Sequence, residues 1–388
     1  MAEVEKRNII ASEEATEEEK TSYLLHKQVF PKIGAKQDKP SIYDYKLEDL
    51  EQKMVEMGQK KFRARQLYKW LYEKRVHSFD EMTDVSKDFR EVLKQTFNIY
   101  RPKVIIEEDS KDGTVKTLSR LFDGSDIETV LMRYEYGDSV CVTSEVGCNM
   151  GCEFCASGLI KKSRGLTAGE MVAQVLNMDE ALRAKNPTSH VTHIVVMGIG
   201  EPMDNYQNVM DFVKIMNSPY ALAIGARHIT VSTCGVIPGI LKFGKEGLQV
   251  NLAISLHAPN NEIRQKIMPI NRAFPLEKLI PAIQQYTKDS GGRLVTYEYI
   301  LLKGINDSPE CALELANLIK PTFGFVNLIP YNPVKEKPYE RSDWQTVKTF
   351  QTILMRHGIK TTVRKEFGTD IDAACGQLRI KEIKKEGI

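Results

Sequence analysis

The chain has 388 residues, of which 42% are apolar and 27% charged, and its formal net charge is +2. Composition and length are ordinary for a soluble protein and suit one large α/β domain with an accessory unit. No run of about 18 uncharged apolar residues occurs, so no membrane span is expected. Residues 1–20 lack an apolar segment, which argues against a secretory signal. Seven cysteines without such a signal indicate a reducing cytoplasm and metal-binding or catalytic thiols.

Two segments precede the main body of the chain. Residues 1–40 are polar and aperiodic, which predicts a flexible tail. Residues 41–100 carry apolar residues at helical spacing, which predicts a small helical accessory domain. Within it, residues 58–75 hold seven Lys or Arg against one Glu, interleaved with aromatics. This pattern would suit contact with RNA phosphates, and a solvated basic helix face is the alternative.

Residues 101–134 predict a β-rich linker, with a strand, the turn "DGSD" and a second strand after residue 113. From residue 135 to 388, strands alternate with helices, which predicts a parallel sheet covered by helices. The helix at 167–185 begins with Thr167 as N-cap and Glu170 at the capping-box position. The α/β fold that fits is a partial (βα)6 TIM-like barrel, open or closed, with its site at the carboxyl ends of the strands. Strands are expected at 139–145, 193–202, 227–235, 249–258, 293–302 and 325–333.

Cys148, Cys152 and Cys155 lie within eight residues after the first of these strands. Thiolates select zinc, Cu(I) or iron–sulfur clusters. A structural zinc site needs four ligands, and the next cysteine is Cys234. Three thiolates can hold three irons of a [4Fe-4S] cluster and leave the fourth iron open to a ligand. The spacing therefore favours an iron–sulfur cluster that takes part in chemistry.

This C-x3-C-x2-C pattern after a barrel strand, with Phe154 before the last cysteine, resembles the radical S-adenosylmethionine (SAM) superfamily. The resemblance implies that the open iron chelates SAM, and that an electron from the cluster releases a 5′-deoxyadenosyl radical. It also implies that Gly200 and Glu201 of "MGIGEP" hold the amino group of SAM. Physically, a glycine admits close approach to the backbone and a carboxylate accepts from an ammonium.

Further stretches resemble the dual-specificity RNA methyltransferase RlmN family, within the radical SAM enzymes. The resemblance spans residues 128–378 and implies methylation of adenosine C2 in 23S rRNA and tRNA. It implies RNA partners, an electron donor such as flavodoxin or ferredoxin, and no membrane; a monomer is the default expectation. The matching stretches are "ETVLM" (128–132), "CVTSEVGC" (141–148), "GEPMDN" (200–205), "VSTCG" (231–235), "AISLHAPNNEIR" (253–264), "PINR" (269–272), "VNLIPYNP" (326–333) and "DIDAACGQL" (370–378).

The resemblance also implies a mechanism with two SAM molecules per turnover. One SAM methylates Cys375, and the radical from a second SAM activates that methyl group, which then adds to the adenine. Glu128 is the implied base for the C2 proton, and Cys141 then attacks Cys375 to form a disulfide and free the product. The implied SAM contacts, besides Gly200 and Glu201, are Ser232, Ser255, Leu256, His257 and Asn332.

Several alternatives remain open on the sequence. The Cfr class shares the fold and cysteines but methylates C8, although Pro202 after Glu201 resembles the C2 enzymes more. An iron–sulfur redox protein or a zinc-stabilised RNA-binding module would share the three cysteines without SAM chemistry. Basic residues at 159–165 (Lys161, Lys162 and Arg164) and at 378–388 would suit RNA phosphates or simply face solvent.

Overall fold

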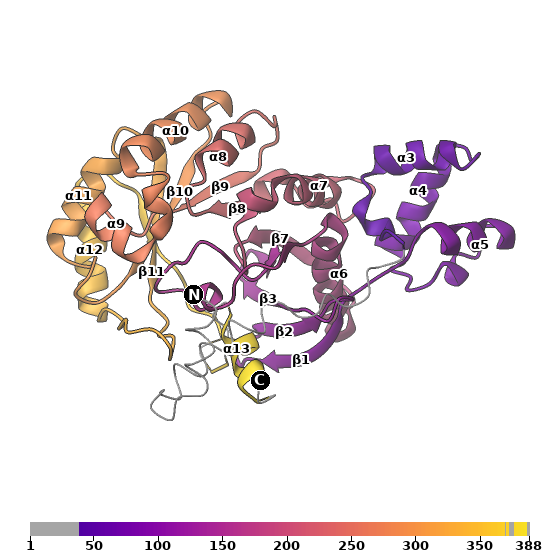
Figure 1. Ribbon diagram of the computed structural model, residues 1–388, viewed down its shortest axis with the longest axis horizontal. Helices are drawn as coiled ribbons and strands as arrows, with labels where there is room; N and C mark the ends of the chain where they lie inside the picture. Colours follow the sequence, from indigo (N-terminus) through magenta and orange to yellow (C-terminus); the bar gives the residue numbers. More distant parts are fainter. Residues whose placement is uncertain (1–38, 369, 372–375, 386–388) are drawn as a thin grey trace, which may run out of the picture.

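The computed structural model describes residues 39–368, 370–371 and 376–385 (Figure 1). The expected tail, residues 1–40, lies outside the described residues except for its last two. A ten-stranded sheet with helices packed on it forms the body, and a helical region stands at one end (Figure 1). In the part of the chain that is described, no helix combines the length and the apolar character needed to cross a membrane.

The helical N-terminal region follows the predicted spacing. Its apolar residues converge on one core, in which Leu50, Leu67 and Leu93 are fully buried. Within a helix the buried residues recur at spacings of three or four, as Leu47, Leu50 and Met54 do, which places them on one face and explains why helices form here. The elements are η1 (Ile42–Asp44), α3 (Leu47–Glu56), α4 (Phe62–Tyr68), the π-helix η2 (Lys69–Glu73), η3 (Phe79–Glu81) and α5 (Lys87–Thr96).

Three antiparallel strands follow, β1 (Lys103–Asp109), β2 (Val115–Arg120) and β3 (Asp126–Tyr134). The predicted strand–turn–strand is the β2–β3 hairpin, closed where the Leu121 amide donates to the Ser125 carbonyl at 2.7 Å. β1 adds a strand that the sequence pattern did not reveal. β3 also pairs with β4 (Gly137–Cys141), so this segment extends the main sheet. The buried run from Ile127 to Met132 explains that pairing, since it is covered on both faces.

The six predicted parallel strands are present, in the order of the chain. They are β4, β7 (Val191–Val196), β8 (Ile229–Thr233), β9 (Asn251–Ser255), β10 (Val295–Leu301) and β11 (Gly324–Pro330). A short strand, β12 (Thr361–Val363), adds to β11. Because β1 and β12 are the two ends of the described sheet, it is an open barrel rather than a closed one.

The predicted first strand of this series is shorter than expected. Residues 139–145 divide between β4 and β5 (Glu145–Val146), and β5 pairs instead with β6 (Arg164–Gly165). The strand is divided because the amides of Ser144 and Glu145 both donate hydrogen bonds to the Ile199 carbonyl, at 3.0 and 3.1 Å. The chain thereby leaves the sheet at its carboxyl edge and enters the cysteine loop.

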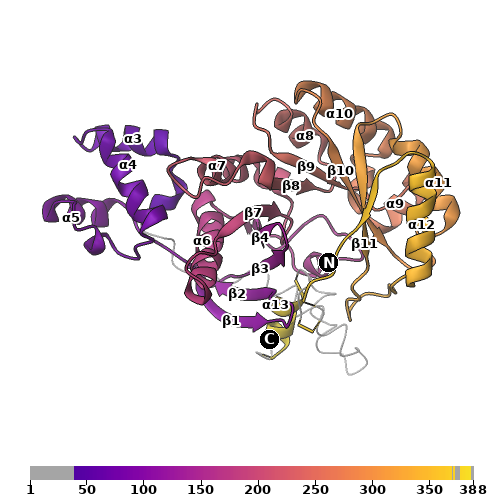
Figure 2. The same cartoon turned by 180° about the vertical axis from the view of Figure 1, so that it is seen from behind.

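Helices cover the parallel strands. They are α6 (Ala168–Lys185), α7 (Tyr206–Asn217), α8 (Ile237–Phe243), α10 (Leu276–Asp289), α11 (Pro309–Ile319) and α12 (Trp344–Arg356). Short helices lie in the loops: η4 (Ala156–Leu159), η5 (Pro202–Asn205), η6 (Ala226–His228), α9 (Asn261–Ile267) and η7 (Pro269–Arg272). The last helix, α13 (Gln377–Lys385), packs on β3, more than 240 residues away in sequence (Figures 1 and 2).

Candidate active site

The cysteine loop leaves β5 and returns through β6. Its neck is closed by a hydrogen bond from the Cys148 amide to the Ile160 carbonyl, 2.9 Å long. Gly147 has a φ of +82°, and a Cβ there would lie 2.1 Å from the Lys161 carbonyl oxygen, so only glycine fits. The three predicted ligands, Cys148, Cys152 and Cys155, are half-buried and lie on this one loop.

These thiols have the chemistry that an iron–sulfur cluster requires. Burial raises the pKa of the Cys148 thiol to about 12 and that of Cys152 well above its usual value. A thiolate at such a position needs a cationic partner, which the irons of a cluster provide. Among the described residues, no three His, Cys, Asp or Glu side chains converge on a single metal ion. Three thiolates can each bind a different iron of a cluster, whereas a structural zinc ion needs four ligands.

Gly200 and Glu201 follow β7 and lie beside the start of this loop. Gly200 has a φ of +112°, and a Cβ there would lie 2.5 Å from the Glu145 side chain. The Glu201 carboxylate is buried and accepts from two backbone amides, Met203 at 3.0 Å and Cys234 at 2.8 Å. Burial raises the pKa of Glu201, and these hydrogen bonds oppose the rise. Glu201 therefore ties the end of β7 to the end of β8.

Three more predicted SAM contacts lie at the carboxyl ends of β8 and β9. Ser232 and Ser255 lie on these adjacent strands, with their hydroxyl oxygens 3.4 Å apart. Leu256 is buried, and its amide donates to the Glu298 carbonyl at 3.1 Å. The carboxyl ends of neighbouring parallel strands thus bring these residues together, as the barrel interpretation expects.

His257 occupies a strained position beside the cysteine loop. Its φ is +58°, which a residue other than glycine rarely adopts. Nδ1 accepts from the Ile300 amide at 3.0 Å, and the ring packs edge-on against Phe154 at 4.9 Å. Burial lowers the pKa of His257 to about 3. The imidazole is therefore neutral, with its proton on Nε2.

Asn332 is exposed, two residues beyond the end of β11, at the same edge of the sheet. Cys141 is the last residue of β4 and is buried between β3 and β7, opposite Val130 and Val195. Cys375, the expected methyl acceptor, lies outside the described residues. The structure does describe Gly376, the residue that follows it.

Glu128 lies at the same edge because β3 runs antiparallel to β4. Its carboxylate accepts from the amides of Gly376 at 2.6 Å and Arg379 at 2.7 Å. It is also paired with the buried ammonium of Lys116, 2.9 Å away. A Cβ on Gly376 would lie 2.9 Å from the Ser157 amide nitrogen, two residues after Cys155. The chain following Cys375 thus lies between Glu128 and the cysteine loop.

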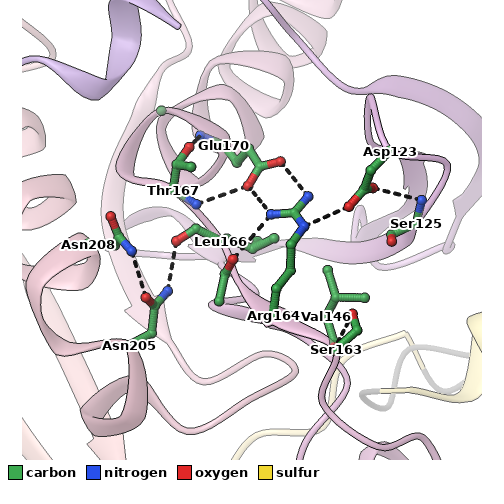
Figure 3. A network of polar contacts seen from close by, with 12 residues as sticks. Asp123, Ser125, Val146, Ser163, Arg164, Leu166, Thr167, Glu170, Asn205 and Asn208 are labelled. Atoms are coloured by element: carbon green, nitrogen blue, oxygen red, sulfur yellow. Dashed lines mark hydrogen bonds and ion pairs between the residues drawn. The ribbon is translucent and has the colours of Figure 1, made fainter. Parts of the chain in front are cut away.

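Two of the three basic residues proposed for phosphate contact have other partners. Arg164 forms ion pairs with Asp123 at 2.6 Å and Glu170 at 2.7 Å, joining the β2–β3 turn to the start of α6 (Figure 3). The Lys162 ammonium lies 2.5 Å from the buried Glu145 carboxylate. These pairs give both side chains a role within the fold, and contact of either with RNA phosphate stays a prediction. Lys161 is exposed.

Figure 3 also shows the predicted start of α6. The Thr167 hydroxyl accepts from the Glu170 amide at 3.2 Å, and the Glu170 carboxylate accepts from the Thr167 amide at 2.9 Å. Both halves of the expected capping box are confirmed. Asn205 donates to the carbonyls of Ser144 and Leu166, at 2.9 and 2.8 Å, which closes the loop's neck from the β7 side.

Sequence reasoning missed three buried charged residues. Lys116 pairs with Glu128, and Glu145 accepts from the Glu201 amide at 3.1 Å. Arg264 is fully buried and donates to the carbonyls of Cys234 at 2.7 Å and Leu256 at 3.3 Å. The family resemblance includes the stretch around Arg264, but nothing in its pattern marks the arginine as buried.

Comparison with known proteins decides the family. A model described as "Ribosomal RNA large subunit methyltransferase N-terminal domain" matches residues 41–99, and one for the radical SAM superfamily matches residues 143–316. "Probable dual-specificity RNA methyltransferase RlmN" of Exiguobacterium sibiricum is 55% identical over 90% of this chain and 99% of its own length. The protein of the same name from Streptococcus thermophilus is 56% identical over 90% of each chain.

The chain belongs to the RlmN family. A solved structure supports the fold: the "radical SAM methyltransferase from Sphaerobacter thermophilus" is 43% identical. It aligns with a TM-score of 0.83 over 87% of this chain and 98% of that one. The expected fold, with an α/β radical SAM body and a helical N-terminal region, is thereby confirmed. The chain is a radical SAM RNA methyltransferase, and its family implies a [4Fe-4S] cluster and SAM.

Proposed function

We propose that this enzyme methylates C2 of adenosine, at position 2503 of 23S rRNA and position 37 of some tRNAs. The names of its relatives, which describe dual specificity for RNA, support both substrates. The observation that carries the mechanism is the place of Gly376. The backbone next to Cys375 is hydrogen-bonded to Glu128 and packed against the cysteine loop. Such a place suits a cysteine that carries a methyl group to a base near the cluster.

The chain's own residues take these roles in the proposal. Cys148, Cys152 and Cys155 hold the [4Fe-4S] cluster, which with SAM supplies the radical that activates the methyl group. Two SAM molecules are consumed per turnover, one of them to methylate Cys375. Glu128 accepts the adenine C2 proton, and Cys141 resolves the Cys375–RNA adduct. SAM is bound by Gly200, Glu201, Ser232, Ser255, Leu256, His257 and Asn332.

The rest of the chain serves the RNA and the electron supply. We assign residues 41–100 to an RNA-binding accessory domain, 101–134 to a β-rich connection and 135–388 to the methyltransferase body. Exposed lysines at and beside α4, namely Lys60, Lys61 and Lys69, support contact with phosphates. The electron donor is a flavodoxin or ferredoxin, and the enzyme acts as a monomer.

The test is nucleoside analysis after anaerobic incubation of reconstituted enzyme with SAM, reductant and unmodified 23S rRNA. Wild type is expected to yield 2-methyladenosine, and Cys375→Ala none. Cys311→Ala is the matched control, because Cys311 is buried in α11, and should retain the product. Mass alone does not separate ring positions, so the nucleosides are separated chromatographically beside standards. A product methylated at C8, or product from Cys375→Ala, would contradict the proposal.

A further inference from the structure

Glu128 caps a helix from another element of the fold. Its Oε2 accepts from the Gly376 amide and its Oε1 from the Arg379 amide. Since α13 begins at Gln377, Gly376 is the residue just before the helix and Arg379 lies in its first turn, so neither amide has a partner within the helix. A carboxylate at a helix N-terminus also interacts favourably with the helix dipole. A glutamate on β3 thus takes the place of an N-cap side chain.

Lys116 makes this arrangement possible. It lies on β2, beside β3, and its side chain is 0% exposed while that of Glu128 is 3% exposed. A buried carboxylate is costly unless a positive charge compensates it, and the Lys116 ammonium lies 2.9 Å from Oε2. Removing one partner of such a pair leaves an uncompensated charge in the protein interior.

The far side of Gly376 is equally constrained. Gly376 has a φ of +82°, and a Cβ there would approach the Ser157 amide nitrogen to 2.9 Å and the Ala156 carbonyl carbon to 3.1 Å. Ala156 and Ser157 begin η4, directly after Cys155. The backbone at Gly376 is therefore held between the Glu128 carboxylate and the cysteine loop. Its position depends on both.

We propose that Lys116 is a positioning residue for the methyl-carrying cysteine. Its ammonium orients Glu128 so that both carboxylate oxygens cap α13, which fixes the chain at Gly376, one residue after Cys375. Both oxygens of Glu128 are engaged in this state, so its role as base requires that one contact be exchanged during turnover. The inference rests on the proposed function, in which Cys375 accepts the methyl group.

The test measures the anchor without relying on activity. Hydrogen exchange of full-length enzyme, followed for peptides spanning residues 376–385, reports the amides that Glu128 holds. Lys116→Met is expected to speed exchange of the Gly376 and Arg379 amides about tenfold to a hundredfold, as befits loss of charge-assisted hydrogen bonds. Lys116→Arg keeps the charge and should restore much of the protection. The rate at which iodoacetamide alkylates Cys375 should rise in parallel in Lys116→Met.

Arg133→Met is the matched control. It removes an ion pair with Asp138, 2.9 Å long, at the other end of β3, the strand that carries Glu128. It should leave exchange over residues 376–385 and alkylation of Cys375 unchanged. Exchange of peptides from β7 to β11 shows whether each variant is folded. If Lys116→Met fails to fold, Glu128→Gln removes the charge with little change of shape and should produce the same local loss of protection.

Two results separate this inference from the proposed function. A folded Lys116→Met protein with wild-type exchange over 376–385 would overturn the anchor, whatever the activity. Wild type that makes no 2-methyladenosine would overturn the proposed function, while the exchange result would stand. If both hold, Lys116→Met should lower kcat for methylation and leave the KM for RNA unchanged, because no RNA contact is altered.

Discussion

The helical N-terminal region and the carboxyl edge of the parallel strands are stabilised in different ways. The helical region has an apolar core, and pairs such as Lys53–Glu56 lie on its surface, with side chains 34% and 52% exposed. The carboxyl edge instead buries charged and polar groups, among them Glu201, His257 and Glu128. A helix satisfies its backbone internally and needs only an apolar face, whereas irregular loops need side chains to bind their free amides. Buried polar residues therefore mark where loops are held in fixed positions.

The largest expected effect concerns His257. Its pKa is about 3 in the folded chain against an ordinary 6.5, so the unfolded chain binds more protons between these values. The free energy of unfolding should therefore be undiminished above pH 6.5 and fall as the pH drops toward 3, by roughly 4 kcal/mol in all. Urea unfolding at several pH values measures this slope. His257→Asn, which tolerates the positive φ, should flatten it; an equal slope in both proteins would contradict the assignment.

A smaller effect is expected for Glu201→Gln. The glutamine keeps one acceptor oxygen, but its amide group would face the amide of either Met203 or Cys234, donor against donor. One buried amide is left without a partner, which costs about 1–3 kcal/mol. The shift of the urea midpoint at pH 7 measures it. A loss within about 0.5 kcal/mol would show that the loops at this edge do not depend on the carboxylate.

The smallest effect is expected from the same substitution in the helical region. Glu56→Gln removes a surface pair with Lys53, 3.1 Å long on α3. Exposed pairs of this kind contribute little, so the free energy of unfolding should change by no more than about 0.5 kcal/mol. Urea unfolding beside Glu201→Gln compares identical chemistry in the two regions. Equal losses of unfolding free energy from Glu56→Gln and Glu201→Gln would contradict the contrast between the two regions.

Local patterns in the sequence predicted the regular elements well. Alternating strands and helices gave the six parallel strands, and the spacing of Thr167 and Glu170 predicted a capping box that the structure contains. These signals are local because strand and helix periods of 2 and 3.6 residues appear within one element. β1 and β12 lack such a local signal, because β1 is largely exposed and β12 is short. Each becomes a strand by pairing with a neighbour.

The candidate site was predicted in part. The sequence named the residues that follow successive strands, and the carboxyl edge brings them together. It did not show that Lys162 and Arg164 are paired with carboxylates, or that Lys116 is buried. The partner of a charged side chain depends on which strands meet, and those strands are far apart in the chain. Such pairings have no periodicity from which they could be read.

The sequence by itself determined the cysteine loop, the alternation of strands with helices and the motifs that carry the family resemblance, because each depends on residues close together in the chain. Only the tertiary structure decided that the sheet is open, that Glu201 joins two strand ends, and that Glu128 caps α13. The contacts of Glu201 with Cys234 and of Glu128 with Gly376 each join residues more than 30 positions apart, and the openness of the sheet depends on its two end strands. A buried charge is tolerated only where the fold supplies its partner, and the fold alone specifies where that partner lies.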